Sequence, residues 1–149
     1  MITIRDISID EIDDVLRLHQ ATAPWYRINR AALTEYITET RYKIVGIYRD
    51  DMIIGIIILM IVKDEADIIF IETSTSARRL GYGLSLINWV THEYNLHDVY
   101  LEVNKTNEAA IAFYKKIGFI TVGNRRNYYK SGDGLIMRYS VLSDVTRET

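Results

Sequence analysis

Residues 67–94 read DIIFIETSTSARRLGYGLSLINWVTHEY, and this stretch decides the fold. Residues 67–74 are rich in isoleucine, as expected of a buried strand, and 81–94 place apolar residues at helical spacing. Gly81 and Gly83 stand where the strand leads into the helix. Because glycine has no side chain, backbone N–H groups can approach a phosphate there, and the helix dipole favours its negative charge. The stretch therefore predicts a phosphate-binding turn.

Two arginines, Arg78 and Arg79, precede the turn and can add charge-assisted contacts to phosphate oxygens. A dinucleotide-binding fingerprint is excluded because it requires a third glycine at position 86, where Leu86 stands. The alternative is an arginine-rich surface turn before a helix, and the spacing alone does not separate this turn from a phosphate site.

Strands and helices alternate along the whole chain. We expect helices at 9–21, 30–39, 81–94 and 107–117, and strands at 2–5, 43–49, 52–62, 67–74, 98–103, 119–124 and 134–141. Ser8 and Glu11 form a capping-box signature at the first helix, and Gly118 stops the last one. The order predicts an α/β (α+β) fold in which a mixed, mostly antiparallel sheet of six to seven strands carries helices on both faces.

Length and composition indicate one domain over 1–142, with a polar tail at 143–149. The chain has no cysteine, which excludes disulfides and thiolate nucleophiles and fits a reducing compartment. The first residues lack a signal peptide, and the apolar run 52–62 is too short to cross a bilayer, so we expect a cytoplasmic protein that does not insert into membranes. A net charge of −2 gives no general attraction to nucleic acid. The three histidines have no spacing suited to a metal, and no metal site is predicted.

A second informative stretch, 101–119, reads LEVNKTNEAAIAFYKKIGF. Together with the R-x-x-G-x-G turn, it resembles the GCN5-related N-acetyltransferase (GNAT) superfamily, and within it the RimI-type and archaeal protein N-terminal acetyltransferases. The similarity continues into 125–129 and 135–137. The resemblance implies the GNAT fold and transfer of an acetyl group from acetyl-CoA to the free α-amine of protein N-termini in a ternary complex.

The resemblance also implies which residues bind acetyl-CoA. They lie on the strand end, on the glycine turn and on the helix of the second stretch: Ile71, Glu72, Thr73, Arg78, Arg79, Leu80, Gly81, Tyr82, Gly83, Leu84, Asn107 and Tyr114. Glu72 and Thr73 depart from the apolar residues usual in the family, and Thr75 replaces a common proline. Contacts through the strand backbone tolerate these changes.

Two residues match the catalytic groups of the family, Glu102 the general base and Tyr114 the general acid. A protein α-amine has a pKa of about 7.7–8.0, so a carboxylate acting through water can take its proton without extreme tuning. Asp67 is the alternative base and Glu72 a third choice. Without the resemblance, Glu102 reads as an exposed strand residue, Tyr114 as a core-edge aromatic and Asn107 as a helix N-cap.

Four aromatic residues match positions that hold the substrate peptide in the family. Tyr128 and Tyr129 are expected in the loop between the last two strands, and Trp25 and Tyr26 near the pocket for the first residue. The alternatives are a solvated hairpin tip for the tyrosines and ordinary packing for Trp25.

Two other functions remain as alternatives. One is acetylation of a lysine side chain or a small-molecule amine on the same fold. The other is a non-catalytic CoA- or RNA-binding module, which rests on the glycine turn and the short basic, aromatic segment 125–130. The net charge does not favour a nucleic-acid partner, and the sequence leaves open a homo-oligomer.

Overall fold

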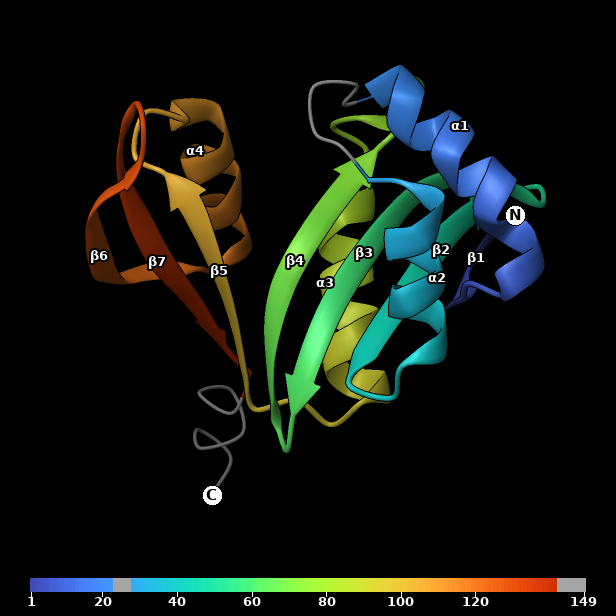
Figure 1. Cartoon of the computed structure of the whole chain (residues 1–149), viewed down its shortest axis with the longest axis horizontal. Coiled ribbons are helices and arrows are strands. Elements are labelled where there is room, and N and C mark those ends of the chain that lie inside the picture. The colour runs from blue at the N-terminus through green and yellow to red at the C-terminus, as the bar shows by residue number, and fades with distance from the viewer. Residues whose placement is uncertain (23–27, 142–149) are drawn as a thin grey trace.

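The computed structural model describes residues 1–22 and 28–141. In this range, seven strands form one sheet in the order β1-β2-β3-β4-β5-β7-β6, with helices on both faces (Figure 1). The strands are β1 (Ile2–Asp6), β2 (Tyr42–Arg49), β3 (Met52–Val62), β4 (Glu65–Thr73), β5 (Asp98–Asn104), β6 (Ile120–Tyr129) and β7 (Gly132–Ser140). The helices are α1 (Ile12–Thr22), α2 (Arg30–Thr38), α3 (Tyr82–Glu93) and α4 (Glu108–Ile117), with short 3-10 turns η1 (Ile9–Glu11) and η2 (Thr75–Ala77). The predicted fold class and element order are confirmed.

The first predicted helix begins as the 3-10 turn η1 before it continues as α1. The backbone N–H of Ser8 donates to Oε1 of Glu11 at 3.0 Å, which is the hydrogen bond expected from a capping box. Arg5 and the hydroxyl of Tyr48 also donate to the Glu11 carboxylate, at 2.7 and 2.6 Å. Glu11 therefore ties the start of the helical segment to β1 and β2.

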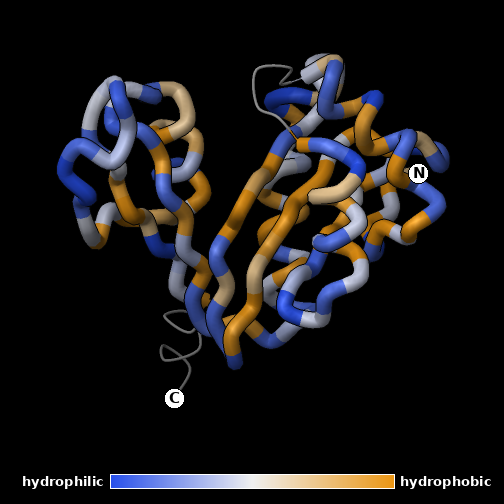
Figure 2. The backbone as a smooth tube through the Cα atoms, in the orientation of Figure 1, coloured by the Kyte–Doolittle hydropathy of each residue, from blue (hydrophilic) through white to orange (hydrophobic). Residues whose placement is uncertain are grey.

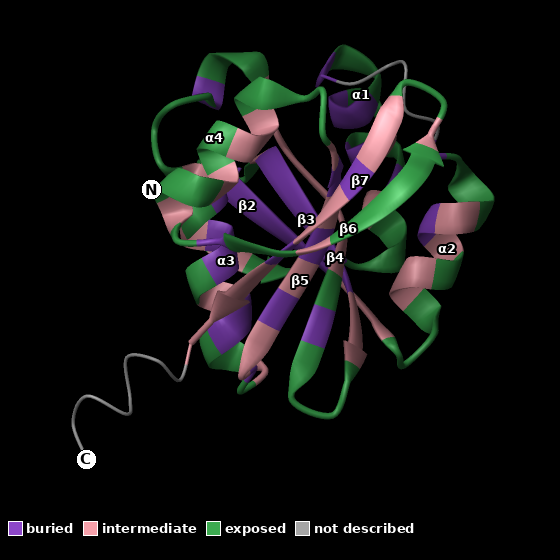
Figure 3. Ribbon diagram, turned by 90° about the vertical axis from the view of Figure 1, so that its left-hand side faces the viewer, coloured by how far each residue is buried: buried purple, intermediate pink, exposed green. Residues whose placement is uncertain are grey.

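β3 lies in the middle of the core and is buried on both faces. Ile57 and Leu59 belong to a cluster beneath α3, whereas Ile56 and Ile58 belong to a second cluster beneath α1 and α2. This two-sided burial explains why the run 52–62 is apolar without alternation. Hydrophobic residues follow the central strands, and buried residues concentrate in the sheet (Figures 2 and 3). None of the helices in residues 1–22 and 28–141 is long and apolar enough to span a membrane.

The sheet divides between β4 and β5, the one parallel pair of neighbouring strands in the described residues. Their pairing covers only three residue pairs, from Glu65 with Asp98 to Asp67 with Tyr100. Beyond that point β4 runs on to Thr73 and β5 to Asn104, and the two strands diverge (Figure 1). The unpaired edges of β4 and β5 therefore form a fork in the sheet.

The last two strands are longer than predicted. β6 extends to Tyr129 and β7 begins at Gly132, so Tyr128 and Tyr129 lie at the end of a strand and the prediction of a loop was wrong. The segment was difficult to recognise because its pairing is irregular between Arg125 and Tyr129, and Asn127 has a positive φ of 55°. Such a bulge breaks the alternating pattern by which strands are recognised.

Candidate active site at the fork of the sheet

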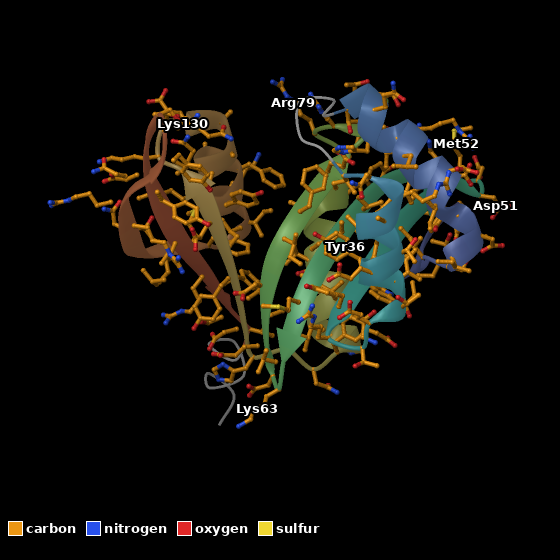
Figure 4. All side chains as sticks on the ribbon, viewed as in Figure 1. Tyr36, Asp51, Met52, Lys63, Arg79 and Lys130 are labelled. Atoms are coloured by element: carbon orange, nitrogen blue, oxygen red, sulfur yellow. The ribbon has the colours of Figure 1, made fainter. Side chains whose placement is uncertain are left out.

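The glycine turn lies at the start of α3. Gly81 is the N-cap of this helix and has a φ of 81°, a left-handed conformation that glycine adopts without strain. Arg79 also has a positive φ, of 65°, and its side chain lies at the open end of the fork, whereas Lys63 lies at the closed end (Figure 4). Arg78 and Leu80 are exposed beside it. The turn thus presents a helix N-terminus and two cations near the open end of the fork.

Gly83 has a packing role that the sequence did not reveal. A Cβ atom at this position would lie 2.7 Å from Cζ of Phe113, so the Phe113 ring lies directly against the backbone of Gly83. Phe113 belongs to α4, which lies on the other arm of the fork, and its side chain is 42% exposed. The contact therefore connects the start of α3 to α4.

The strand end that is expected to hold the cosubstrate contains a buried carboxylate. Oε1 of Glu72 lies 3.2 Å from Nδ1 of His19, and the hydroxyl of Thr22 donates to Oε2. The side chains of Glu72 and His19 are 6% and 7% exposed. Both carboxylate oxygens of Glu72 are thus engaged with α1, and the side chain anchors this helix to the end of β4.

Asn107 and Tyr114 lie at opposite ends of α4. Asn107 is the N-cap, and its Oδ1 accepts a hydrogen bond from the backbone N–H of Ala110 at 3.2 Å. Tyr114 packs edge-on against Phe113 and Phe119, with ring centroids 5.3 and 5.6 Å apart. Burial raises the pKa of Tyr114 to about 12, so its phenol stays protonated at neutral pH. The capping contact is compatible with the predicted role of Asn107 in acetyl-CoA binding, and the packing contacts are compatible with the predicted role of Tyr114 in catalysis.

The two alternative bases lie together where β4 and β5 separate. Asp67 and Glu102 line a cavity of about 290 Å³, together with Ile68, Tyr100, Leu101, Arg125 and Ile136. Nε of Arg125 lies 3.0 Å from Oε1 of Glu102, whose side chain is 26% exposed. Oε2 of Glu102 is buried and has no hydrogen-bond partner in the described part of the chain. Burial raises the pKa of Asp67, an effect that the charge of Arg125 opposes.

Glu102 and Tyr114 approach the fork from opposite faces of the sheet. Leu101 and Val103 point into the core beneath α3, and Tyr114 packs against the same cluster. Because side chains alternate along a strand, Glu102 points to the other face. A reacting group held in the fork could thus meet the carboxylate on one face and the phenol on the other.

The tyrosine pair lies on the same surface as Glu102. The ring planes of Tyr128 and Tyr129 are nearly perpendicular, with centroids 4.9 Å apart, and both rings pack over Gly134. The guanidinium carbon of Arg125 lies 5.4 Å from the centroid of Tyr128. Trp25 and Tyr26 lie outside the described residues, so their predicted place near the substrate is not tested.

Sequence reasoning missed two partners of these carboxylates, Arg125 of Glu102 and His19 of Glu72. Both pairs join residues that are far apart in sequence: the register of β5, β7 and β6 brings Arg125 to Glu102, and the packing of α1 against β4 brings His19 to Glu72. The basic residues beside the tyrosine pair were visible as a motif, but nothing in the sequence indicated which of them reaches β5.

Comparisons with known proteins bear on the family and the fold of the chain. The sequence profile of the acetyltransferase (GNAT) family matches residues 11–119. The ribosomal protein bS18-alanine N-acetyltransferase of Salmonella typhimurium is 34% identical over 97 residues, which cover 63% of this chain and 66% of that protein. The chain therefore spans just under two thirds of the length of that relative.

Two further proteins are similar over nearly the whole chain. An N-alpha-acetyltransferase of Sulfurisphaera tokodaii is 29% identical over 146 residues, with 87% of each chain covered. The crystal structure of Ard1 from Thermoplasma volcanium has a TM-score of 0.79 at 28% identity, covering 95% of this chain and 98% of that one. Because the family profile extends over most of the sequence and the fold agrees, the chain belongs to the acetyltransferase (GNAT) family.

Proposed function

We propose that the chain is an acetyl-CoA-dependent N-acetyltransferase whose acceptor is the free α-amine of a protein or peptide N-terminus. The observation that carries this proposal is the position of Glu102, a carboxylate with one unpaired, buried oxygen, at the cavity where β4 and β5 separate. Two similar proteins support the choice of acceptor, because one is named for acetylating the alanine of a ribosomal protein and the other as an N-alpha-acetyltransferase.

Acetyl-CoA enters this proposal as the acyl donor, and the fork has the features that it requires. Among the described residues, the backbone of β4 beyond Asp67 has no partner strand on the side of β5, so we take its N–H and C=O groups as the partners of the pantetheine arm. The N-terminus of α3, with Gly81 in the left-handed conformation, suits the pyrophosphate, and Arg78 and Arg79 suit additional phosphate charge. A free N–H of the β4 edge would stabilise the oxyanion of the tetrahedral intermediate.

Glu102 acts as the general base in this mechanism. The amine must lose a proton before its lone pair attacks the thioester carbonyl, and an ionised carboxylate can take that proton through a water molecule. The unpaired Oε2 retains its capacity to accept a hydrogen bond. Asp67 is the alternative base at the same cavity, and burial raises its pKa, but the buried oxygen without a hydrogen-bond partner among the described residues belongs to Glu102.

Tyr114 acts as the general acid. As the intermediate collapses, its nitrogen gives up its extra proton to water, the carbon–sulfur bond breaks, and CoA leaves as a thiolate that takes up one proton. A phenol with a pKa of about 12 is protonated at neutral pH and can donate that proton. In this mechanism the amine attacks acetyl-CoA directly in a ternary complex, which needs no acetyl-enzyme intermediate, and the chain has no cysteine to form a thioester.

The substrate peptide would lie along the face that carries Glu102, with its backbone against Tyr128 and Tyr129. Aromatic rings with hydroxyl tips provide both apolar contact and hydrogen bonds, which suits the binding of a peptide whose side chains vary. Trp25 and Tyr26, which lie outside the described residues, stay a prediction for the pocket of the first residue of the peptide.

Steady-state assays of CoA release test this proposal. Short peptides with a free α-amine should be turned over, whereas the same peptides with a blocked α-amine and an internal lysine should not. Initial rates at varied concentrations of both substrates should give intersecting double-reciprocal lines, as a ternary complex requires. Turnover of the blocked peptides or of a polyamine in place of the free peptides would assign the enzyme to a different acceptor.

A further inference from the structure

Arg125 lines the cavity at the fork beside Glu102. Its side chain is 55% exposed, and ion pairs at such exposure contribute little to folding stability. Nε of Arg125 nevertheless lies 3.0 Å from one oxygen of Glu102, and the charge of Arg125 opposes the rise in the pKa of Asp67. A small contribution to stability combined with contacts to the proposed base suggests a role in function.

The strand register explains how Arg125 reaches Glu102. Arg125 pairs with Gly134 on β7, and Glu102 pairs with Ile136 on the other side of the same strand. Arg125 therefore has to extend across β7 to reach β5. Tyr128 and Tyr129 pack over Gly134, and the guanidinium of Arg125 lies near both the ring of Tyr128 and the carboxylate of Glu102.

The two carboxylate oxygens of Glu102 differ in their contacts. Nε of Arg125 forms an ion pair with Oε1, whereas Oε2 is buried without a partner among the described residues. A buried carboxylate oxygen without a hydrogen bond is unfavourable, and a proton donor that arrives with the substrate would relieve this. The side chain must be held in place for Oε2 to remain in this state, because otherwise a rotation would bring it to solvent.

We propose that Arg125 is a positioning residue, which holds Oε1 of Glu102 and so keeps Oε2 at the cavity as the proton acceptor for the attacking amine. This inference rests on the proposed role of Glu102 as the base. Arg125 touches the base and the ring of Tyr128, so it also links the part of the surface that would hold the peptide to the group that would accept the proton.

A double-mutant cycle tests the proposal. Arg125→Met keeps most of the length of the side chain but removes the donor, Arg125→Lys restores a cation, and Glu102→Gln removes the base. Arg126→Met is the matched control, because Arg126 is the exposed neighbour and has no ion pair with Glu102. All variants are assayed on whichever amine the unmodified enzyme acetylates, so a wrong choice of acceptor does not remove the readout.

We expect Arg125→Met to lower kcat at least tenfold, with the KM for acetyl-CoA and the Tm nearly unchanged, and Arg125→Lys to recover part of the loss. In the Glu102→Gln background, Arg125→Met should lower kcat by less than about twofold, because the effects of substituting two residues that act through one another are not additive. Arg126→Met should stay within about twofold of the unmodified enzyme. Equal losses in both backgrounds, or normal activity of Arg125→Met, would overturn the proposal.

A crystal structure of Arg125→Met provides a readout that does not depend on turnover. The carboxylate of Glu102 should leave its position while the backbones of β5 and β7 stay in place. An unchanged carboxylate would overturn the role of Arg125 even if every amine tested proved to be a poor substrate. A displaced carboxylate in an enzyme that rejects free α-amines would support the role of Arg125 and contradict the proposed acceptor.

Discussion

At the scale of single residues, the choice between Glu102 and Asp67 as the base can be tested directly. Glu102→Gln keeps the shape of the side chain and removes its basicity, so kcat should fall by about 10² or more, the usual contribution of a general base. Acetyl-CoA affinity, measured by calorimetry, should be unchanged. Asp67→Asn should have a far smaller effect on kcat, and a larger loss for Asp67→Asn than for Glu102→Gln would identify Asp67 as the base.

Removing the hydroxyl of Tyr114 distinguishes a chemical role of this residue from a packing role. Tyr114→Phe keeps the ring contacts with Phe113 and Phe119 and removes the proton donor. We expect kcat to fall between about tenfold and 10²-fold with little change in Tm. Because the pKa of Tyr114 is about 12, the phenol remains protonated up to about pH 10, and its titration should not reduce activity below that pH. Full activity of Tyr114→Phe would restrict this residue to packing.

At the scale of elements, the start of α3 depends on the backbone conformation of Gly81. A Cβ atom here would contact nothing within 4 Å, so the cost of Gly81→Ala comes from its φ of 81° alone. We expect Gly81→Ala to lose about 1 kcal/mol of the free energy of unfolding and to bind acetyl-CoA less tightly. Gly81→Asn is the matched variant. It should recover part of the stability and part of the acetyl-CoA affinity, because asparagine tolerates this conformation. Urea unfolding measures the stability and calorimetry measures the affinity. Equal stability and affinity of Gly81→Ala and the unmodified protein would show that the turn can adopt another backbone conformation.

The junction of η1 with β1 and β2 should make folding stability depend on pH. Burial alone would raise the pKa of Glu11, but hydrogen bonds from Arg5, Tyr48 and Ser8 outweigh it and hold the pKa at about 2, below the usual 4.5. The ionised form is thus favoured by folding. The ionised carboxylate of Glu11 contributes about 2 kcal/mol to the free energy of unfolding. This contribution is fully present above about pH 5 and is lost as the pH falls toward 2.

The variant Glu11→Gln removes the group that titrates at this junction. Its free energy of unfolding, from urea titrations between pH 6 and pH 3, should fall less steeply on acidification than that of the unmodified protein. Asp13→Asn removes a carboxylate from an exposed pair with Arg30 and should change the acid dependence far less. Parallel curves for Glu11→Gln and the unmodified protein would mean that Glu11 does not control acid stability.

At the scale of the whole molecule, local sequence patterns were sufficient for the order of elements but not for the geometry of the fork. The isoleucines of 52–62 and the two glycines at the start of α3 are local signals, and both led to the correct elements. The three-pair contact of β4 with β5 depends on long-range register, which no local pattern encodes. For the same reason the neighbours of Glu102 could be found only in the structure.

The tyrosine pair illustrates the same limit within one element. Bulged pairing between Arg125 and Tyr129 hides a strand from an alternation test, so Tyr128 and Tyr129 were expected in a loop. Their position at the end of β6 depends on pairing with Gly132 and on packing over Gly134. The resemblance to a family identified the pair. The structure shows in addition that Arg125 contacts both Tyr128 and Glu102.

The most direct test of the α-amine assignment is a peptide that carries both kinds of amine. A peptide with a free N-terminus and an internal lysine would be incubated with the enzyme and acetyl-CoA, and fragmentation mass spectrometry would locate the acetyl group. We expect acetylation of the α-amine, with the lysine left unmodified. Acetylation mainly on the lysine, or none on the α-amine under conditions in which a polyamine is turned over, would contradict the assignment.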